Sequence, residues 1–483
     1  MIPVLISTAL HYRWIVLIAT LFISSLGIWA FTQMKIDAYP DISSQMVQVI
    51  TTYPGRAPEE VERQITVPIE IAMRNVPKVE TIRSRTIFGL SVVQMIFTEG
   101  TESYWARQRV QEKLTSLRLP TGAEADLGPL ATAYGEMLRY ELVSDGRYDL
   151  MELRTLNDWV VIPRLLRTTG VAEVSNFGGY EKQYGVLLDP AQLQRFGLSV
   201  NDVVEAIQTN NTSAGGSVLS RGSMSFVIRG RGALQNEAEI GSIFIKSIGG
   251  TPLYVRDVAN VRLDAKVPAG IFSKDATDES VEGIVLLRKG ENPSEALKAI
   301  NESVHDVNTD GLPEGVQVIP YYDRSQLIDS TLHTVGHSVL LGVGLVIVVL
   351  LAFLGRPSLA GLVALTIPFA LLFALVMMYF MDIPIGLLSI GAIDFGIIVD
   401  GTVIMAESIA IRLDAREHDK NRQSQTIAQT VLAAALEVER PVFFSILMIV
   451  GAFMPLLTLT HIEGLLFRPM AITIVCALLG AAL

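Results

Sequence analysis

The stretch "GAIDFGIIVDGTVIMAES", residues 391–408, is apolar enough to predict a membrane-spanning helix, yet it contains three carboxylates, Asp394, Asp400 and Glu407. On insertion scales, a charged side chain at the middle of a bilayer costs about 2.5–3.5 kcal/mol, so acids at this depth indicate a function. Asp400 and Glu407 are seven residues apart and fall on nearly the same helix face, about 10 Å apart along the axis. Asp394 lies roughly 120° around the same helix, so we expect the three acids to line a crevice between helices.

A structural role is the alternative for each of these acids. Glu407 fits it best, because Arg412 follows five residues later and could pair with it. Asp400 is near the centre of its span, and no lysine occurs between Lys298 and Lys420. A carboxylate that is buried without a fixed cation is suited to reversible protonation. We therefore favour a proton relay, with the stronger argument for Asp400.

The composition places the chain in the membrane class. Of the 483 residues, 50% are hydrophobic and 18% are charged, compared with about 25% charged in ordinary soluble domains. The mean hydropathy is +0.41. The net charge of −11 argues against nucleic-acid binding. The only cysteine, Cys476, excludes an intrachain disulfide and a metal site built from several cysteines.

The apolar runs predict six spans. The first, Trp14 to Phe31, is long enough to cross about 30 Å of hydrocarbon and is expected to be an uncleaved anchor. Five further spans are predicted, namely Val335–Leu354, Leu359–Phe380, Ile385–Ile411, Pro441–Leu459 and Pro469 onward. The last run remains apolar up to Leu483, so we expect the chain to be the first part of a longer protein.

Positive charges predict the orientation of the spans. Five basic residues lie in the segment from Arg412 to Arg440, which is therefore expected to be cytoplasmic. The same count places the polar region 35–332 outside. Within the basic segment, "SQTIAQTVLAAALEV" has helical spacing and is interpreted as a separate connecting helix, with a helix lying on the membrane surface as the alternative.

The external region predicts two interleaved ferredoxin-like units. Residues 46–117 read as strand, helix, two strands and helix, and a second round begins at "MLRYELVS". That round continues with a helix and the strands "VAEVSNFG" and "KQYGVLLD", and "GIVLLRKG" opens a further β-α-β segment. Residues 190–266 are interpreted as an insertion, whose Gly- and Ser-rich stretch "NNTSAGGSVLSRGSMSFVIRGRG" predicts a long exposed hairpin.

The layout resembles the first half of a resistance-nodulation-division (RND) transporter. The segment "DAYPDISSQMVQVITTYPGRAPEEVERQITVPIE" after the first span is similar to the start of the porter domain in that family. Multidrug members carry two adjacent aspartates in the fourth span, whereas here Asp400 is followed by Gly401. The pattern "DFGIIVDG", with Glu407 after it, resembles the heavy-metal efflux branch. That resemblance implies export of a transition-metal cation in exchange for protons, with Asp394, Asp400 and Glu407 as the proton-pathway acids.

The resemblance also implies an architecture and partners. Residues 1–34 would hold transmembrane helix 1, 35–332 a periplasmic porter domain of ferredoxin-like subdomains with a docking insertion near 190–266, and 333–483 helices 2–6, the last incomplete. The implied assembly is a homotrimer in the bacterial inner membrane, in contact with membrane lipid, a periplasmic adaptor protein and an outer-membrane channel. The docking hairpin would reach an adjacent protomer.

The candidate metal ligand is Glu136, in "YGEMLRY". The resemblance implies that exporters of zinc, cobalt or nickel favour glutamate here; a solvent-facing acid at a strand end is the alternative. Oxygen and nitrogen ligands suit these divalent ions, with zinc the first choice as transported substrate, whereas copper(I) or silver would require thioether clusters. The external methionines are scattered and are expected to pack in cores. His333 and His337 have the i, i+4 spacing of a metal pair, but an interfacial pair without metal is favoured.

Several functions stay open at this point. No cofactor is expected, and the sequence lacks G-x-S-x-G, Walker-type and H-E-x-x-H motifs, so we expect a secondary transporter driven by protons and not an enzyme. A proton-driven multidrug pump, a protein-export accessory factor and a receptor or lipid-handling relative share the same layout.

Overall fold

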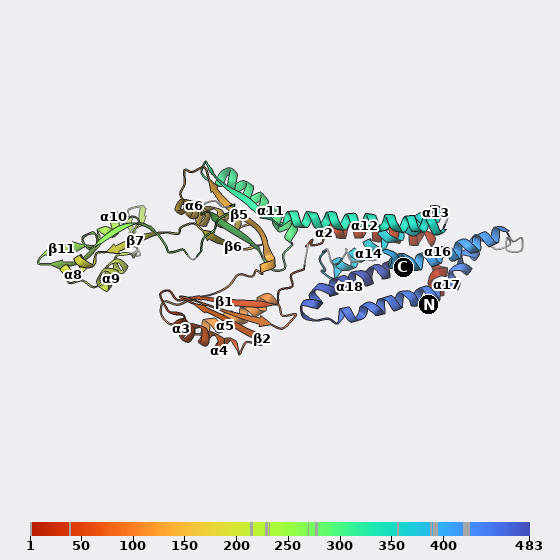
Figure 1. Cartoon of the computed structure of the whole chain (residues 1–483), viewed down its shortest axis with the longest axis horizontal. Coiled ribbons are helices and arrows are strands. Elements are labelled where there is room, and N and C mark those ends of the chain that lie inside the picture. Colours follow the sequence, from red (N-terminus) through yellow and green to blue (C-terminus); the bar gives the residue numbers. More distant parts are fainter. Residues whose placement is uncertain are drawn as a thin grey trace.

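The computed structural model describes residues 2–37, 40–212, 216–227, 230, 232–268, 270–275, 279–354, 357–386, 389, 395–418 and 426–483. The molecule is elongated, and Figure 1 shows three parts along its long axis. A helical bundle that contains both termini lies at one end, two sheet units lie in the middle, and an inserted unit lies at the far end.

The first sheet unit follows the strand–helix–strand–strand–helix order predicted from the sequence and adds an unpredicted fourth strand. Apolar residues alternate along its strands, so Val47, Val49, Val93 and Met95 point into a core covered by the helices. The strand order is β2-β3-β1-β4, with antiparallel neighbours throughout. Its elements are β1 (Met46–Thr52), α3 (Pro58–Val61), the π turn η1 (Glu62–Thr66), α4 (Val67–Met73), β2 (Val79–Ile87), β3 (Leu90–Phe97), α5 (Ser103–Ser116) and β4 (Glu124–Leu127).

The second sheet unit repeats this plan with an insertion between its second and third strands. The strand order is β14-β5-β13-β6, the same arrangement as in the first unit. Its elements are β5 (Glu136–Ser144), α6 (Leu150–Leu156), the π turn η3 (Asn157–Val161), α7 (Ile162–Leu165), β6 (Val171–Gly178), β13 (Val281–Leu287), α11 (Pro293–Asp306), the π turn η5 (Val307–Gly311) and β14 (Val316–Asp323).

A proline explains the π turn in the first helix of each sheet unit. Proline lacks the backbone N–H, and its ring clashes with the carbonyl four residues earlier, so a helix must widen or bend before it. In the first unit Val67 donates to Glu62, five residues back, immediately before Pro68. In the second unit Ile162 donates to Asn157 immediately before Pro163. Both units therefore solve the same local problem in the same way.

The inserted unit begins earlier than the sequence predicted. The strand "KQYGVLLD" was expected in the second round of the external region, but β7 (Lys182–Leu188) pairs along its whole length with β12 (Ala259–Ala265). Side chains of both strands pack on the core of the inserted unit, around Val203, Val255 and Val258. The expectation placed β7 in the wrong unit because alternation along a strand does not identify its partner strand. The remaining elements are α8 (Pro190–Phe196), α9 (Val200–Asn210), β8 (Val218–Arg221), β9 (Met224–Val227), α10 (Glu237–Gly241), β10 (Phe244–Ile248), β11 (Thr251–Tyr254) and the 3-10 turn η4 (Val255–Asp257).

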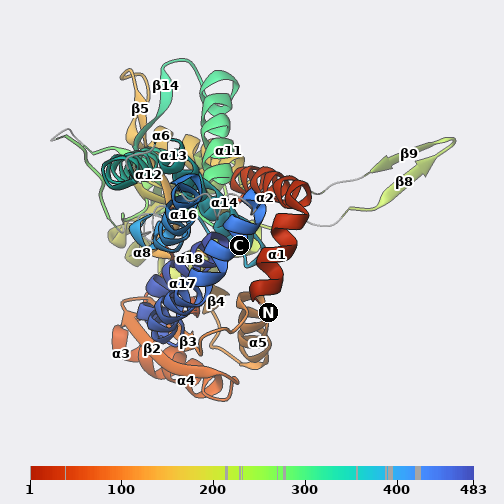
Figure 2. The same cartoon turned by 90° about the vertical axis from the view of Figure 1, so that its right-hand side faces the viewer.

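The predicted hairpin is formed by β8 and β9. Every residue of the two strands is exposed, including the apolar Val218 and Val227. Figure 2 shows the hairpin extending sideways, away from the remainder of the protein.

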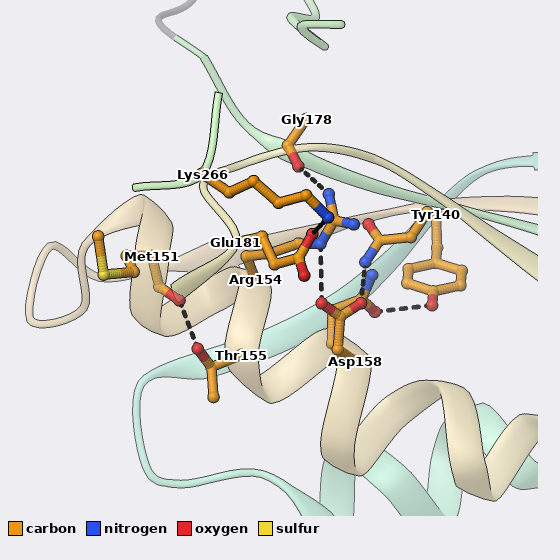
Figure 3. Close-up of polar contacts among 10 residues, drawn as sticks. Tyr140, Met151, Arg154, Thr155, Asp158, Gly178, Glu181 and Lys266 are labelled. Carbon is orange, nitrogen blue, oxygen red and sulfur yellow. Dashed lines mark hydrogen bonds and ion pairs between the residues drawn. The ribbon is translucent and has the colours of Figure 1, made fainter. Parts of the chain in front are cut away.

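Polar contacts fix the base of the inserted unit, as Figure 3 shows. Arg154 on α6 donates to the carbonyl of Gly178 (2.7 Å) and pairs with Asp158 (2.9 Å). Lys266 pairs with Glu181 (2.9 Å), which joins the two chain segments that enter and leave the unit.

The helical bundle contains five helices that are long and apolar enough to cross a membrane, judged by length and composition within the described part of the chain. They cover Arg13–Gln33, Ser325–Ala352, Pro357–Phe380, Ile427–Leu457 and His461–Ala482. The bundle elements are α1 (Ile2–His11), α2 (Arg13–Gln33), α12 (Ser325–Leu354), α13 (Pro357–Ala364), α14 (Thr366–Phe380), α16 (Phe395–His418), α17 (Ile427–Leu457) and α18 (His461–Ala482).

Four helices differ in extent from the predicted spans. Helix α18 begins at His461, eight residues before the predicted start at Pro469, and runs through that proline. Helix α12 begins at Ser325, ten residues before the predicted start, so it continues directly from the second sheet unit into the bundle. The predicted connecting helix is the first part of α17, which runs through Pro441 without a break. Its start is fixed by a capping box between Thr426 and Gln429. The predicted span Ile385–Ile411 was wrong at its start, because Ile385 forms a β-bridge with Ile36. Its helix is described from Phe395, as α16, whose acidic and basic side chains keep it out of the apolar set.

Candidate functional site

Two of the three predicted proton-relay acids lie in one groove between α12 and α16. The groove has a volume of about 560 Å³. Helix α16 contributes Asp400, Glu407 and Asp414, which follow one another at intervals of seven residues and therefore share a helix face. Helix α12 contributes an apolar wall, formed by Leu345, Val346, Val349 and Leu350. Both Asp400 and Glu407 are exposed in the chain as it stands, so the groove is accessible to solvent or to another segment.

Asp394 lies outside the residues that the structure describes. The predicted arrangement of three acids around one crevice therefore remains a prediction for Asp394.

Glu407 also lines a second cavity, between α16 and α17. This cavity has a volume of about 730 Å³ and includes Ser408, Arg412 and Glu437. Arg412 donates through Nε to the Glu437 carboxylate at 3.0 Å. The sequence offered Arg412 as a partner for Glu407, but the guanidinium is directed to α17 instead. Glu407 thus lines both the groove that holds Asp400 and the polar cavity between α16 and α17.

A glycine brings α16 and α17 close together beside these acids. A Cβ atom on Gly401 would lie 3.0 Å from the Val442 side chain, which is tighter than ordinary packing. The glycine next to Asp400 therefore allows the two helices to pack in direct contact.

The candidate metal ligand Glu136 is the first residue of β5 and is half-buried. Its carboxylate pairs with Arg139, with 2.7 Å between Oε2 and Nη2, and the carboxylate raises the pKa of the Arg139 guanidinium. The same guanidinium lies 3.6 Å from Glu282 on β13, a carboxylate that is only 6% exposed. Glu136 is therefore neither a lone surface acid nor part of a ready-made ligand set, because a protein cation already occupies its vicinity.

Glu282 is further held by Tyr321 on β14, whose hydroxyl donates to it. Burial, together with this contact, raises the pKa of Tyr321 to about 12. Four side chains on the open face of the second sheet, namely Glu136, Arg139, Glu282 and Tyr321, thus form one polar cluster.

The histidine pair lies on α12. The rings of His333 and His337 are stacked, with centroids 6.5 Å apart. Within the described ranges, no group of three or more His, Cys, Asp or Glu side chains is arranged to hold a metal ion. Neither this pair nor Glu136 forms a complete metal site with its described neighbours.

Two site residues were missed from the sequence. Asp414 continues the seven-residue spacing of Asp400 and Glu407 and could have been found by extending that pattern. Glu282 is the one charged residue in the strand "VEGIVLL", and a carboxylate in so apolar a strand indicates a buried partner.

Comparison with known proteins identifies relatives along the whole chain. A family model described as AcrB/AcrD/AcrF family matches residues 5–483. The chain is 39% identical to protein HelA of Legionella pneumophila, over 100% of this chain and 47% of that protein. It is 38% identical to the cobalt-zinc-cadmium resistance protein CzcA of Cupriavidus metallidurans, over 99% and 46%, and 37% identical to the cation efflux system protein CusA of Escherichia coli (strain K12), over 100% and 47%.

A solved structure shares the fold. The chain superimposes on the crystal structure of a heavy metal efflux pump (crystal form II) with a TM-score of 0.90 and 42% sequence identity, covering 99% of this chain and 47% of the other. The chain spans about half the length of the proteins it matches.

Proposed function

Because the chain belongs to the AcrB/AcrD/AcrF family of RND transporters, we propose that it is part of a secondary transporter that exports a divalent transition-metal cation in exchange for protons. The names of its relatives support a metal substrate, since they include a cobalt-zinc-cadmium resistance protein and a heavy metal efflux pump. The sequence pattern around Asp400, in which a glycine takes the place of a second aspartate, supports the same branch.

The groove between α12 and α16 is the observation that carries the proposal. It holds Asp400 and Glu407 on one face of α16, opposite an apolar wall formed by α12. Because Glu407 also borders the cavity between α16 and α17, a proton on Asp400 would have a second acid within the same groove and an exit to a polar cavity. In this proposal Asp400 is the central proton carrier, Glu407 relays to the polar cavity, and Asp394 is the third acid of the pathway.

Zinc, cobalt or nickel is the proposed cation, with zinc the first choice. Glu136 is the proposed ligand in the external region, and oxygen donors suit these ions. Three external methionines, Met73, Met95 and Met137, are fully buried in the cores of the sheet units, so they are not placed to bind a soft monovalent ion. The expectation that the external methionines pack in cores is met by these three, whereas Met46 and Met151 are half-buried and Met224 is exposed on the β8–β9 hairpin.

The units have proposed counterparts in such a pump. The antiparallel order β2-β3-β1-β4, repeated in the second unit, is that of a ferredoxin-like fold, so we assign both sheet units to the porter domain (35–332). The inserted unit would be the docking subdomain, with the β8–β9 hairpin reaching an adjacent copy in a homotrimer. Residues 1–34 and 333–483 would lie in the bacterial inner membrane with the porter domain in the periplasm, where an adaptor protein and an outer-membrane channel would complete the system.

Proton flux from proteoliposomes tests the proposal. The complete protein is reconstituted with a pH gradient, and zinc, cobalt, nickel or copper(I) is added singly. We expect one divalent ion to raise the flux, and Asp400→Asn to abolish that response. Asp329→Asn is the matched control, because Asp329 is an exposed acid of α12 that does not line the groove.

Each other result has a definite meaning. Flux that no metal changes would refute the metal assignment, and a response to organic cations instead would identify a multidrug pump. Normal metal export by Asp400→Asn would refute the proton-carrier role.

A further inference from the structure

Four separate chain segments meet where the helical bundle joins the second sheet unit. The segment after α2 pairs with the segment after α14: the Ile385 N–H donates to the Lys35 carbonyl (2.8 Å), and the Asp37 N–H donates to the Ile385 carbonyl (2.9 Å). The other two segments are the 3-10 turn η2 (Ala133–Gly135), which leads into β5, and the start of α12. Ile385 precedes α16, the helix that carries Asp400.

Arg324 connects these segments. It immediately precedes α12, its side chain is 8% exposed, and its Nη2 lies 2.7 Å from Asp37 Oδ1. Its Nη1 donates to the carbonyl of Tyr134 in η2. Its backbone N–H donates to the carbonyl of Met137 at 3.0 Å.

The contacts of Arg324 therefore lie on both sides of Glu136 in the chain. Tyr134 is two residues before the proposed metal ligand, and Met137 is the residue after it. A shift of Arg324 relative to Asp37 must displace the start of β5, because the guanidinium and the backbone hold that strand from two directions.

Burial makes the Asp37–Arg324 pair act as a unit. Separating two buried charges leaves each without its counter-charge and is strongly unfavourable. The segments they belong to are thus expected to move together or not at all. A cavity of about 220 Å³ beside the pair, lined also by Tyr134 and Met137, leaves room for such movement.

Helix α12 extends the connection into the bundle. It is one continuous helix of 30 residues from Ser325 to Leu354, and its second half forms the apolar wall opposite Asp400 and Glu407. A change in how α16 packs on that wall would reach Arg324 along the helix.

We propose that Asp37 and Arg324 are positioning residues that couple protonation in the groove between α12 and α16 to the position of Glu136. This inference rests on the proposed function and adds the path by which its two proposed sites communicate. It predicts a loss of coupling without a loss of metal binding when the pair is broken.

The test compares metal binding with metal-stimulated proton flux in the complete protein. Zinc affinity is measured by titration calorimetry in detergent, and zinc-stimulated proton flux is measured in proteoliposomes, for Asp37→Asn, Arg324→Gln and the double variant. We expect zinc affinity within about twofold of the unmodified protein and a loss of stimulated flux of about tenfold in each single variant. If the two residues act as a pair, the double variant loses no more than either single variant.

Two further variants separate coupling from general damage. Lys35→Gln removes the exposed Lys35–Asp382 pair (3.4 Å) at the same junction and is expected to leave the flux unchanged. Asp37→Asn keeps an oxygen acceptor for Arg324, so it carries the test if Arg324→Gln does not fold. Arg324→Lys keeps the charge and is expected to recover part of the flux.

Stimulated flux that is unchanged in both single variants would overturn the inference. Zinc affinity that falls in parallel with flux would also overturn it, because the pair would then only support the β5 strand. If zinc does not stimulate proton flux in the unmodified protein, it is the assignment of zinc as the exported ion that fails, which is a different result.

Discussion

The hydroxyl of Tyr140 donates a 2.8 Å hydrogen bond to Asn157 Oδ1 inside the second sheet unit, and both residues are completely buried. Tyr140 lies on β5 and Asn157 opens the π turn η3, so this bond joins the central sheet to the widened part of its covering helix. Burial raises the pKa of Tyr140 well above its ordinary value, which keeps the hydroxyl protonated as a donor.

Tyr140→Phe should therefore destabilise the second sheet unit locally. The change leaves a buried acceptor on Asn157 without its donor, which costs about 1–3 kcal/mol. Native-state hydrogen exchange of the complete protein measures this as faster exchange of the β5 amides. Amides of β1 and β3 in the first sheet unit serve as an internal control, and equal acceleration in both units would contradict the local explanation.

Gly283→Ala should disrupt the same region from the opposite strand. Gly283 is the cross-strand partner of Tyr140, and a Cβ at this position would lie 2.0 Å from the ring. We expect destabilisation of about 1–3 kcal/mol by overpacking. The double variant Gly283→Ala with Tyr140→Leu should lose less free energy of unfolding than the sum of the two single losses, because the smaller side chain makes room for the new Cβ. Strictly additive free energies, measured by hydrogen exchange, would show that the ring is not the obstacle.

Arg139→Gln should strengthen zinc binding if Glu136 is a ligand. The guanidinium that competes for the Glu136 carboxylate is removed, and a half-buried pair of this kind contributes about 1 kcal/mol, which corresponds to roughly fivefold in affinity. Titration calorimetry on the complete protein measures the change. Arg147→Gln, which removes the guanidinium paired with Asp145 after the far end of the same strand, should leave the affinity unchanged. Weaker binding by Arg139→Gln would assign the arginine to holding the site together.

Glu173→Gln should stabilise the protein at neutral pH and lose that effect in acid. Burial raises the pKa of Glu173 on β6, so the folded protein gains stability relative to pH 7 as the pH falls through the raised value toward the unfolded value of about 4.3. Glutamine removes the penalty on the charged form, so the variant's advantage in Tm should be largest at pH 7 and absent near pH 4.

Asp145→Asn is the control, because the pKa of Asp145 is shifted in the opposite direction and its effect on stability has the opposite pH dependence. The Arg147 guanidinium lowers the pKa of Asp145, so its contribution is present at neutral pH and disappears as the pH falls through the lowered value. A Glu173→Gln advantage of equal size at pH 4 and pH 7 would exclude titration as its cause.

Local patterns were sufficient to predict the elements of the first sheet unit, apart from the short strand β4. The alternation in β3 and the acids in the first turn of α3 are signals contained within a few residues. The groove acids Asp400 and Glu407 were also predictable, because seven-residue spacing on a helix fixes a shared face whatever the helix packs against.

Long-range pairing was the part that sequence could not supply. The sequence predicts β7 as a strand just as it predicts β6, and only the pairing of β7 with β12 assigns it to the inserted unit. The partners of Arg139, Arg324 and Arg412 were hidden for the same reason, since each guanidinium contacts a residue on another segment. The early start of α12 was missed because hydropathy records where a helix becomes apolar, whereas the helix begins at the polar residues that follow β14.

The repeated π turn has a consequence for the history of the molecule. The two units share both strand order and a proline-linked irregularity at the same place, which is the pattern that duplication of one ancestral segment would leave. In the first sheet unit the second and third strands along the chain, β2 and β3, are joined by the two residues Phe88 and Gly89. In the second copy the equivalent turn has been replaced by the inserted unit, which leaves the sheet at Gly178 and returns at Val281, its cross-strand partner. An insertion whose two ends lie on adjacent strands leaves the sheet around it intact. The inserted unit could therefore be gained in a single event and diversify independently of the second sheet unit.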